Sequence, residues 1–213
     1  MLKIISFDLD GTLVKSSYAD KVWLEGLPKL YSKEKNISLD KAKEYIFNLY
    51  DKVGKNNKEW YDIEWWFEKF NLKKPWKDLL YNYKNHIDLY PEVVKILENI
   101  KEKFDLIIIS NAKKEFIDIQ LKETNIKPFF KFVFSSLSDF DLVKKTPDVY
   151  NQILNILNIK SSEIMHIGDN FEFDYISPIK IGINSVYLDR TKKQNGNHTT
   201  YSLSEIKKFL VDY

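Results

Sequence analysis

The 213-residue sequence predicts an α/β fold: a doubly wound parallel sheet with an inserted all-helical cap domain. The chain opens on a short apolar segment typical of a buried strand, and strand-like and helix-like segments alternate after about residue 90. A helix-rich block without a convincing strand separates these two parts. Alternating strands and helices are typical of a parallel sheet with helices on both faces. We therefore expect residues 1–15 and 88–213 to form the core and residues 16–87 to form the cap.

The first predicted strand ends on two carboxylates. Residues 4–14 read Ile-Ile-Ser-Phe-Asp-Leu-Asp-Gly-Thr-Leu-Val, so Asp8 and Asp10 follow an apolar run, and Gly11 allows a tight turn. In open α/β sheets the chemistry lies beyond the carboxyl ends of the strands. Two acids placed there repel each other unless a cation or a shared proton lies between them. The segment predicts a metal ion or a proton-sharing pair; the alternative is an ordinary surface turn that happens to be acidic.

The block after the first strand has helical spacing and many aromatic residues. Ser38 is the expected N-cap of one helix, with Lys41 at the position where a capping box would have Glu or Gln. Pro75 is expected at the start of another helix. The predicted helices of this block cover residues 18–33, the segment after Ser38, residues 58–70 and residues 75–86.

The rest of the chain alternates between the two kinds of element. Its strand-like segments are short and apolar, and its helix-like segments repeat apolar residues every three or four positions. The predicted strands are residues 105–109, 131–134, 164–167 and 185–188. The predicted helices are residues 91–103, 113–124, 147–157, 173–180 and 203–211, with a polar loop at 191–200.

Composition excludes several classes of function. The formal net charge is +2 and is spread along the chain, so nucleic-acid binding is not indicated. The chain has no cysteine, which excludes disulfides, thiolate metal sites and a cysteine nucleophile. The first predicted strand leaves no room for a signal peptide, and no apolar run approaches the roughly 18 residues that cross a bilayer. We expect a cytoplasmic protein without a membrane partner.

Polar residues also follow the later predicted strands. Ser110 and Asn111 end one strand, Asp169 ends another with Asp174 five residues beyond it, and residues 144–147 (Lys-Lys-Thr-Pro) precede a helix. Carboxylates without nearby thiol or imidazole groups suit a hard ion such as Mg²⁺. A metal, an ammonium group and small hydroxyl donors together suit a phosphoryl group, whose oxygens need positive charge and hydrogen bonds.

These segments resemble the four motifs of the haloacid dehalogenase (HAD) superfamily. Residues 7–13 (Phe-Asp-Leu-Asp-Gly-Thr-Leu) resemble the first motif, Ser110-Asn111 the second and residues 144–147 the third, and Asp169 with Asp174 resembles the fourth. The motifs occur in the family's order on both sides of the helical block. The resemblance implies a Rossmann-like core, a helical C1 cap and a phosphatase-like activity.

The resemblance also implies the chemical roles of the acids. Asp8 matches the nucleophile that forms an aspartyl-phosphate. Asp10 matches the general acid/base, which protonates the leaving oxygen and then activates water. Mg²⁺ is assigned to the carboxylates of Asp8 and Asp169 and to the main-chain carbonyl of Asp10, while Asp174 orients the groups around the metal.

Substrate binding and charge neutralisation are implied for a second set of residues. Ser110 and Asn111, together with Gly11 and Thr12 of the first motif, are expected to bind the phosphorylated substrate.

A motif-three lysine is expected to neutralise the nucleophile and the transferring group. The family often has Lys-Pro-x-Pro before this helix, and here only Pro147 fills a proline position. Counting back three residues gives Lys144, and the missing first proline leaves Lys145 open.

Asp10 bears on the reaction type. Family members that cleave carbon–halogen bonds need no acid to protonate an alkoxide, and in them this second aspartate is typically replaced. We therefore expect a Mg²⁺-dependent phosphohydrolase acting on a small phosphorylated metabolite. The alternatives are a phosphomutase, a 2-haloacid dehalogenase and a non-catalytic binding protein on the same fold. The substrate, and whether the protein is a monomer or a homodimer, are left open.

The cap has a conspicuous aromatic cluster of Trp60, Tyr61, Trp65 and Trp66. A small helical unit must bury apolar area, so we expect these residues to form the cap core rather than a surface that stacks on substrate. The hinges are expected near residues 14–17 and 87–90.

Three other positions have competing interpretations. His166 lies inside an apolar strand and is expected to be a hydrogen-bonded core residue rather than a metal ligand. Arg190 is expected to pair with a surface acid rather than to bind phosphate. Lys15 and Ser16 are expected to form a solvated hinge; the alternative is that they meet the substrate as the cap closes.

Overall fold

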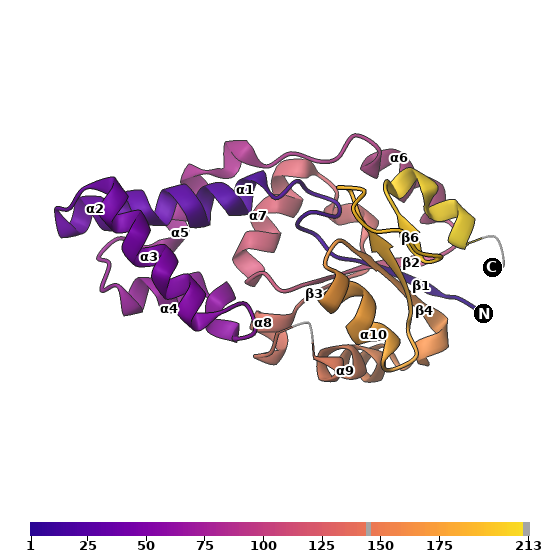
Figure 1. The fold of residues 1–213 in the computed structure, drawn as a ribbon. Coiled ribbons are helices and arrows are strands. Elements are labelled where there is room, and N and C mark those ends of the chain that lie inside the picture. The colour runs from indigo at the N-terminus through magenta and orange to yellow at the C-terminus, as the bar shows by residue number, and fades with distance from the viewer. Residues whose placement is uncertain (144–145, 211–213) are drawn as a thin grey trace.

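The computed structural model describes residues 1–143 and 146–210. A sheet flanked by helices forms one end of the molecule, and helices α1 to α5 extend from it as an elongated arm (Figure 1). The N-terminus lies at the end of the molecule opposite the arm. Within the described residues, no helix is both long enough and apolar enough to span a membrane.

The sheet is parallel throughout and confirms the predicted fold class. Within the described residues it has six strands in the order β3-β2-β1-β4-β5-β6, and every pairing is parallel. The first strand is central, with Phe7 opposite Ile108 on one side and Ile167 on the other. The strands are β1 (Ile4–Phe7), β2 (Asp105–Ser110), β3 (Phe132–Ser135), β4 (Ile164–Gly168), β5 (Asn184–Leu188) and β6 (Thr199–Thr200).

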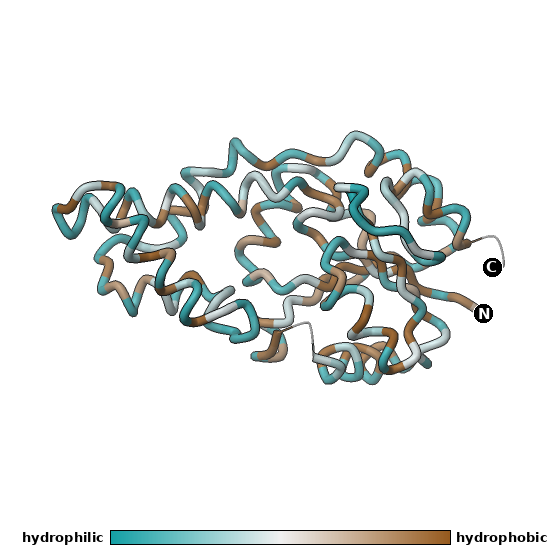
Figure 2. Tube along the Cα trace, viewed as in Figure 1, coloured by the Kyte–Doolittle hydropathy of each residue, from teal (hydrophilic) through white to brown (hydrophobic). Residues whose placement is uncertain are grey.

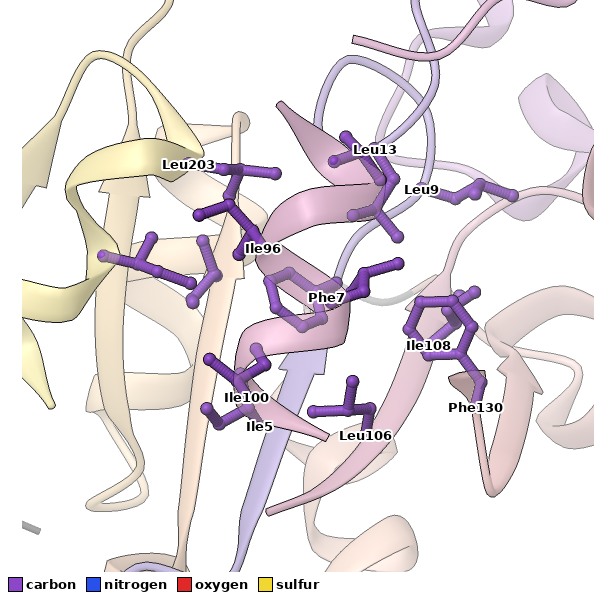
Figure 3. Packing of buried hydrophobic residues seen from close by; sticks show 14 of the residues in the cluster. Ile5, Phe7, Leu9, Leu13, Ile96, Ile100, Leu106, Ile108, Phe130 and Leu203 are labelled. Atoms are coloured by element: carbon purple, nitrogen blue, oxygen red, sulfur yellow. The ribbon is translucent and has the colours of Figure 1, made fainter. Parts of the chain in front are cut away.

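The strands bury both faces, as a doubly wound sheet requires. Alternate residues of β1 point to opposite faces, so Ile5 and Phe7 belong to one apolar cluster and Ile4 to another. Figure 3 shows Phe7 at the centre of the first cluster, among residues from α6 (Val93–Ile100) and η7 (Leu203–Phe209). Helix α9 (Pro147–Leu157) covers the other face.

Further helical segments complete the core. They are α7 (Lys114–Thr124), η4 (Lys127–Phe129), α8 (Ser136–Phe140), η5 (Ser161–Glu163), η6 (Phe171–Ile176) and α10 (Ser177–Ile179). Two elements differ from expectation. The polar loop predicted at 191–200 ends in β6, which pairs with β5 through Thr199 and Tyr187, and the short helix α8 was not predicted.

The arm contains the helices predicted for residues 16–87. Ser38 caps α3 as expected, because its side chain accepts a hydrogen bond from the Lys41 amide. The first predicted helix is continuous but includes the π-helical segment η1. The segments are α1 (Ser17–Asp20), η1 (Lys21–Gly26), α2 (Leu27–Lys35), α3 (Leu39–Val53), η2 (Lys58–Tyr61), α4 (Ile63–Lys69), α5 (Trp76–Asn82) and η3 (Lys84–His86).

The arm has its own apolar cluster. Hydrophobic and hydrophilic residues alternate along its helices, whereas hydrophobic residues run along the strands of the sheet (Figure 2). Trp66 is fully buried in the arm's cluster and contacts Tyr50 edge-on, with ring centroids 4.8 Å apart. The cluster continues into the core helix α7 through Phe116 and Ile119.

Two linkers join the arm to the sheet, and they run side by side. Val14 and Leu89 form an antiparallel bridge, and the Lys15 amide donates to the Asp88 carbonyl at 2.9 Å. The Lys15 ammonium lies 2.5 Å from the Asp88 carboxylate, which fits the solvated-hinge interpretation of this residue. The linkers fall where hinges were expected, and the division into two domains stays a prediction.

We expect Trp66→Ala to lower the free energy of unfolding by about 3–5 kcal/mol, because it removes a buried ring and leaves a cavity. The matched control is Tyr81→Ala in the same arm, where the side chain is 54% exposed and its loss is expected to change stability by about 0.5 kcal/mol or less. Urea denaturation followed by circular dichroism measures both. Equal losses from the two variants would contradict the packing described here.

Candidate active site

The first motif forms a tight loop at the carboxyl end of β1. The Asp8 amide donates to the Ile167 carbonyl at 2.9 Å, so Asp8 continues the strand ladder, and its side chain is 7% exposed. The amides of Leu13 and Val14 both donate to the Leu9 carbonyl. The loop turns at Gly11, which has φ +82°. A Cβ at Gly11 would also overlap the Asp169 carboxylate, so glycine lets the two loops approach closely.

The fourth motif brings two more acids to the same edge of the sheet. Asp169 directly follows β4, and the fully buried Asp174 lies in η6. Carboxylate oxygens of Asp8, Asp169 and Asp174 all lie within 4.8 Å of one another. Asp8 thus meets two acids that follow it by 161 and 166 positions in the chain.

The Asn170 amide and the His166 ring hold the Asp174 carboxylate in place. The Asn170 amide donates to Oδ2 at 2.9 Å, and His166 Nε2 lies 3.2 Å from Oδ1. A carboxylate only accepts, so Nε2 carries the proton in this contact. His166 Nδ1 lies 2.8 Å from the Ser6 hydroxyl. His166 is fully buried, which confirms that it is a hydrogen-bonded core residue.

Tyr150 also lies close to the acidic cluster. Burial, together with the charges of Asp174 and Asp8, raises the pKa of Tyr150 well above its usual value. Its hydroxyl therefore stays protonated and donates to the Phe173 carbonyl at 2.8 Å. This bond ties α9 to η6, the segment that carries Asp174.

Ser110 and Asn111 lie at the end of β2 and line the same cavity as the acids. The Ser110 hydroxyl accepts a hydrogen bond from the Ala112 amide at 3.1 Å, which leaves its own proton available to an incoming acceptor. Thr12 is buried, and its hydroxyl donates to Asp169 at 3.3 Å. In this arrangement Thr12 supports an acid, while the substrate-binding roles expected for Thr12 and Gly11 stay predictions.

The acidic cluster fits a hard cation. Its donors are carboxylate oxygens, the ligands that Mg²⁺ prefers, and two of the three residues are buried. Three carboxylates this close repel one another strongly in a partly buried site. Asp8, Asp169 and Asp174 could therefore hold one Mg²⁺ ion, with the Asp10 carbonyl as the further ligand that the resemblance implies.

A cavity of about 340 Å³ opens from these acids toward the arm. Its lining includes Asp8, Asp10 and Ser110 from the sheet edge and Trp60 and Tyr61 from η2. The aromatic cluster of the arm is therefore divided. Trp66 is core and the partly buried Trp65 packs against the same cluster, as expected. Trp60 and Tyr61 line the cavity instead, contrary to the expectation for the cluster as a whole. Lys144 and Lys145 lie outside the described residues.

Arg190 contributes to the site in a way that its position in the sequence did not indicate. Its guanidinium donates to the carbonyls of Gly11 at 3.1 Å and Thr12 at 2.7 Å. It also donates to Glu92 at 2.8 Å and lies over the Tyr90 ring, 3.3 Å from the centroid. The pairing of Arg190 with an acid was expected, but its hydrogen bonds to the first-motif loop were not.

Gln120 is a second residue that the sequence did not single out. It lies on α7, is fully buried, and donates through Nε2 to Asp10 Oδ2 at 3.5 Å. Asp10 also influences the buried Tyr18, because burial and then the Asp10 charge raise the pKa of that phenol. The signal available in the sequence was a glutamine on the otherwise apolar face of a predicted helix, where a polar side chain needs a hydrogen-bond partner.

The family model for haloacid dehalogenase-like hydrolases matches residues 2–182. The match spans most of the chain and includes the first, second and fourth motifs of the site described above. This protein therefore belongs to the haloacid dehalogenase-like hydrolase family.

Similar proteins cover nearly the whole chain. A glyceraldehyde 3-phosphate phosphatase from Methanocaldococcus jannaschii is 24% identical over 97% of this chain and 96% of its own length. A phosphoglycolate phosphatase from Aquifex aeolicus is 28% identical over 79% and 76%. The crystal structure of a HAD phosphatase from Thermococcus onnurineus superposes with a TM-score of 0.87 at 23% identity, covering 99% of this chain and 98% of that one.

We expect Arg190→Ala to lower the free energy of unfolding by about 2–4 kcal/mol, because it removes hydrogen bonds from a charged donor to two loop carbonyls. Arg190→Lys keeps the charge but not the planar fork, and should recover only part of the loss. Thermal or urea denaturation at pH 7 measures both variants. Full stability in Arg190→Ala would show that the first-motif loop does not depend on this contact.

The same variant should alter the pH dependence of stability. Burial would raise the pKa of Glu92, but the hydrogen bond and charge of Arg190 hold it below its usual 4.5. A lowered folded-state pKa stabilises the protein above pH 4.5, and this contribution is lost as the pH falls below it. The stability difference between wild type and Arg190→Ala should therefore shrink on acidification.

Proposed function

We propose that this protein is a Mg²⁺-dependent phosphohydrolase that cleaves a small phosphorylated metabolite through an aspartyl-phosphate on Asp8. The observation that carries the proposal is the convergence of Asp8, Asp169 and Asp174, whose carboxylate oxygens lie within 4.8 Å of one another beside a cavity that Asp10 and Ser110 also line. The similarity to two proteins named as phosphatases supports the same reaction class.

Hydrolysis would proceed in two in-line steps. A carboxylate oxygen of Asp8 attacks phosphorus, the bond to the leaving oxygen breaks, and Asp10 gives that oxygen a proton. Asp10, now ionised, takes a proton from water as the water attacks the phosphorus of the aspartyl-phosphate. The second attack releases phosphate and returns Asp8 to its starting state.

The other groups of the site would stabilise charge and fix geometry. Bound Mg²⁺ would neutralise negative charge on the phosphoryl oxygens. The Ser110 hydroxyl has a proton to donate to one of these oxygens. His166 and the Asn170 amide would keep Asp174 turned toward the cluster. The family resemblance assigns a lysine of the third motif, Lys144 or Lys145, to neutralise the charge of the nucleophile and of the transferring group.

The presence of Asp10 favours phosphate-ester chemistry over carbon–halogen cleavage. An alkoxide leaving group needs a proton, and Asp10 lines the cavity at a position from which it could supply one. A halide leaving group needs none. The amide of the buried Gln120 lies 3.5 Å from Asp10 Oδ2 and would help to position the Asp10 carboxylate for this role.

The direct test is phosphate release from para-nitrophenyl phosphate and from a panel of phosphorylated metabolites. We expect turnover with Mg²⁺, loss of turnover with EDTA, and a loss of at least about a thousandfold in Asp8→Asn, which removes the nucleophile. Asp105→Asn is the matched control, because this exposed acid begins β2 and pairs with Lys131. Full activity in Asp8→Asn, or bisphosphate-dependent isomerisation without net phosphate release, would contradict the proposal.

Gln120→Leu tests how Asp10 is positioned. We expect kcat to fall about five- to tenfold with little change in KM, because the leucine keeps the volume but removes the donor that fixes the Asp10 carboxylate. Glu123→Gln, on the same helix and paired with Lys84 at the surface, should leave kcat unchanged. An unaltered kcat in Gln120→Leu would show that Asp10 needs no support from α7.

A further inference from the structure

The cavity above the acids has two chemically different walls. Its sheet-side wall holds carboxylates and polar groups of the first, second and fourth motifs. Its arm-side wall is largely apolar and aromatic, and its five large side chains come from η1, α3 and η2. These five are Trp23, Leu24, Tyr50, Trp60 and Tyr61.

The two tyrosines of this aromatic wall contribute rings rather than hydroxyl donors. The Tyr50 hydroxyl donates to the Trp23 carbonyl at 3.1 Å. The Tyr61 hydroxyl donates to the Lys55 carbonyl at 3.1 Å. Each phenol proton is thus used within the arm. A sugar or polyol would find few hydrogen bonds on this wall, whereas an apolar surface would find a large contact area.

The rings of the wall are fixed by contacts with one another. Trp23 lies parallel to Phe116 of α7, with centroids 6.0 Å apart and 3° between the planes, and edge-on to Tyr50. Trp60 meets Tyr61 edge-on at 4.9 Å. Aromatic side chains held in this way lose little conformational entropy when a ligand binds, so the wall is preorganised.

Charge on the cavity lining argues against a second anionic group on the ligand. Among the described residues that line the cavity, Lys55 is the one cationic side chain, and it is exposed. The acidic lining includes Asp20 on the arm side as well as the motif carboxylates. On the arm side of the cavity, a carboxylate or second phosphate of the ligand would meet the carboxylate of Asp20 and, among the described residues, the single ammonium group of Lys55.

We propose that the substrate is a phosphate monoester whose leaving group carries a planar unsaturated ring, and that this ring stacks on the wall formed by Trp23, Trp60 and Tyr61. The proposal rests on the proposed phosphohydrolase function. The cavity of about 340 Å³ lies within the roughly 300–1,000 Å³ typical of small-molecule sites. Stacking on an aromatic side chain tolerates many ring types, so the chemical class is a benzylic, heteroaryl or nucleoside-type monoester.

The test compares substrates that differ in the ring but have similar leaving alcohols. Benzyl phosphate is compared with ethyl phosphate, and uridine 5′-monophosphate with ribose 5-phosphate, at fixed Mg²⁺. We expect the ring-bearing member of at least one pair to have a kcat/KM about tenfold higher or more. Equal or lower kcat/KM for the ring-bearing member of both pairs would overturn the ring proposal and leave the phosphohydrolase function intact.

Variants locate the effect on the wall. Trp60→Leu should lower the ratio of the kcat/KM for benzyl phosphate to the kcat/KM for ethyl phosphate at least about threefold. The matched control is Trp65→Leu, a partly buried tryptophan of α4 that packs on Trp66 and does not line the cavity. If both variants reduced the preference for the ring-bearing substrate equally, the ring would not bind at Trp60, and the proposed ring site would be overturned.

A binding measurement separates failure of this proposal from failure of the proposed function. Calorimetry with Mg²⁺ compares benzylphosphonate with ethylphosphonate, neither of which has an ester bond to hydrolyse. Tighter binding of benzylphosphonate in wild type, reduced in Trp60→Leu, supports the ring site even if no phosphate is released in any assay. Equal binding of the two phosphonates overturns it.

Discussion

The mutual repulsion of the acids at the carboxyl edge of the sheet is the constraint on which the rest of the site depends. Two unit charges 4 Å apart repel by about 4 kcal/mol at the effective dielectric constant near a protein surface. Three carboxylates whose oxygens lie within 4.8 Å can be kept together by groups behind them, by a shared proton or by a cation between them. His166 and the Asn170 amide support Asp174, and Thr12 supports Asp169. This arrangement is more typical of a cation-binding site than of a surface turn that happens to be acidic.

The parallel sheet is what makes this concentration of charge possible. Its strands end at one edge, so residues from distant motifs meet without long loops. The first-motif loop is then secured from outside the motifs. Arg190 holds the carbonyls of Gly11 and Thr12, and its charge is balanced by Glu92 rather than by the acids of the site. The single arginine of the chain is thus used to fix the backbone next to Asp10.

Secondary structure and the position of the acids could be predicted from the sequence wherever a local pattern of residues determines them. Strands β1 to β5 could be predicted because each contains an apolar run, and the acids follow from where those runs end. Strand β6 could not, because two threonines carry no apolar pattern and become a strand only by pairing with β5. Arg190 donates hydrogen bonds to carbonyls 178 and 179 residues earlier in the chain, and no sequence pattern predicts a contact over that separation. Trp66 lies on the buried face of a helix, whereas Trp60 and Tyr61 precede that helix in a 3₁₀ turn, where helical periodicity does not assign a face.

Helix α7 links the part of the molecule that holds the acids to the part that would choose the ligand. Gln120 on this helix contacts Asp10, while Phe116, one turn earlier, lies parallel to Trp23 and lines the cavity. Just before the helix, Lys113 pairs with Asp62 at 2.9 Å and Glu64 at 2.5 Å in the arm, with its side chain only 14% exposed. Because these contacts lie on one short element, a displacement of the arm would act on the support of Asp10 as well as on the aromatic wall. Helix α7 therefore contacts both Asp10 and the aromatic wall.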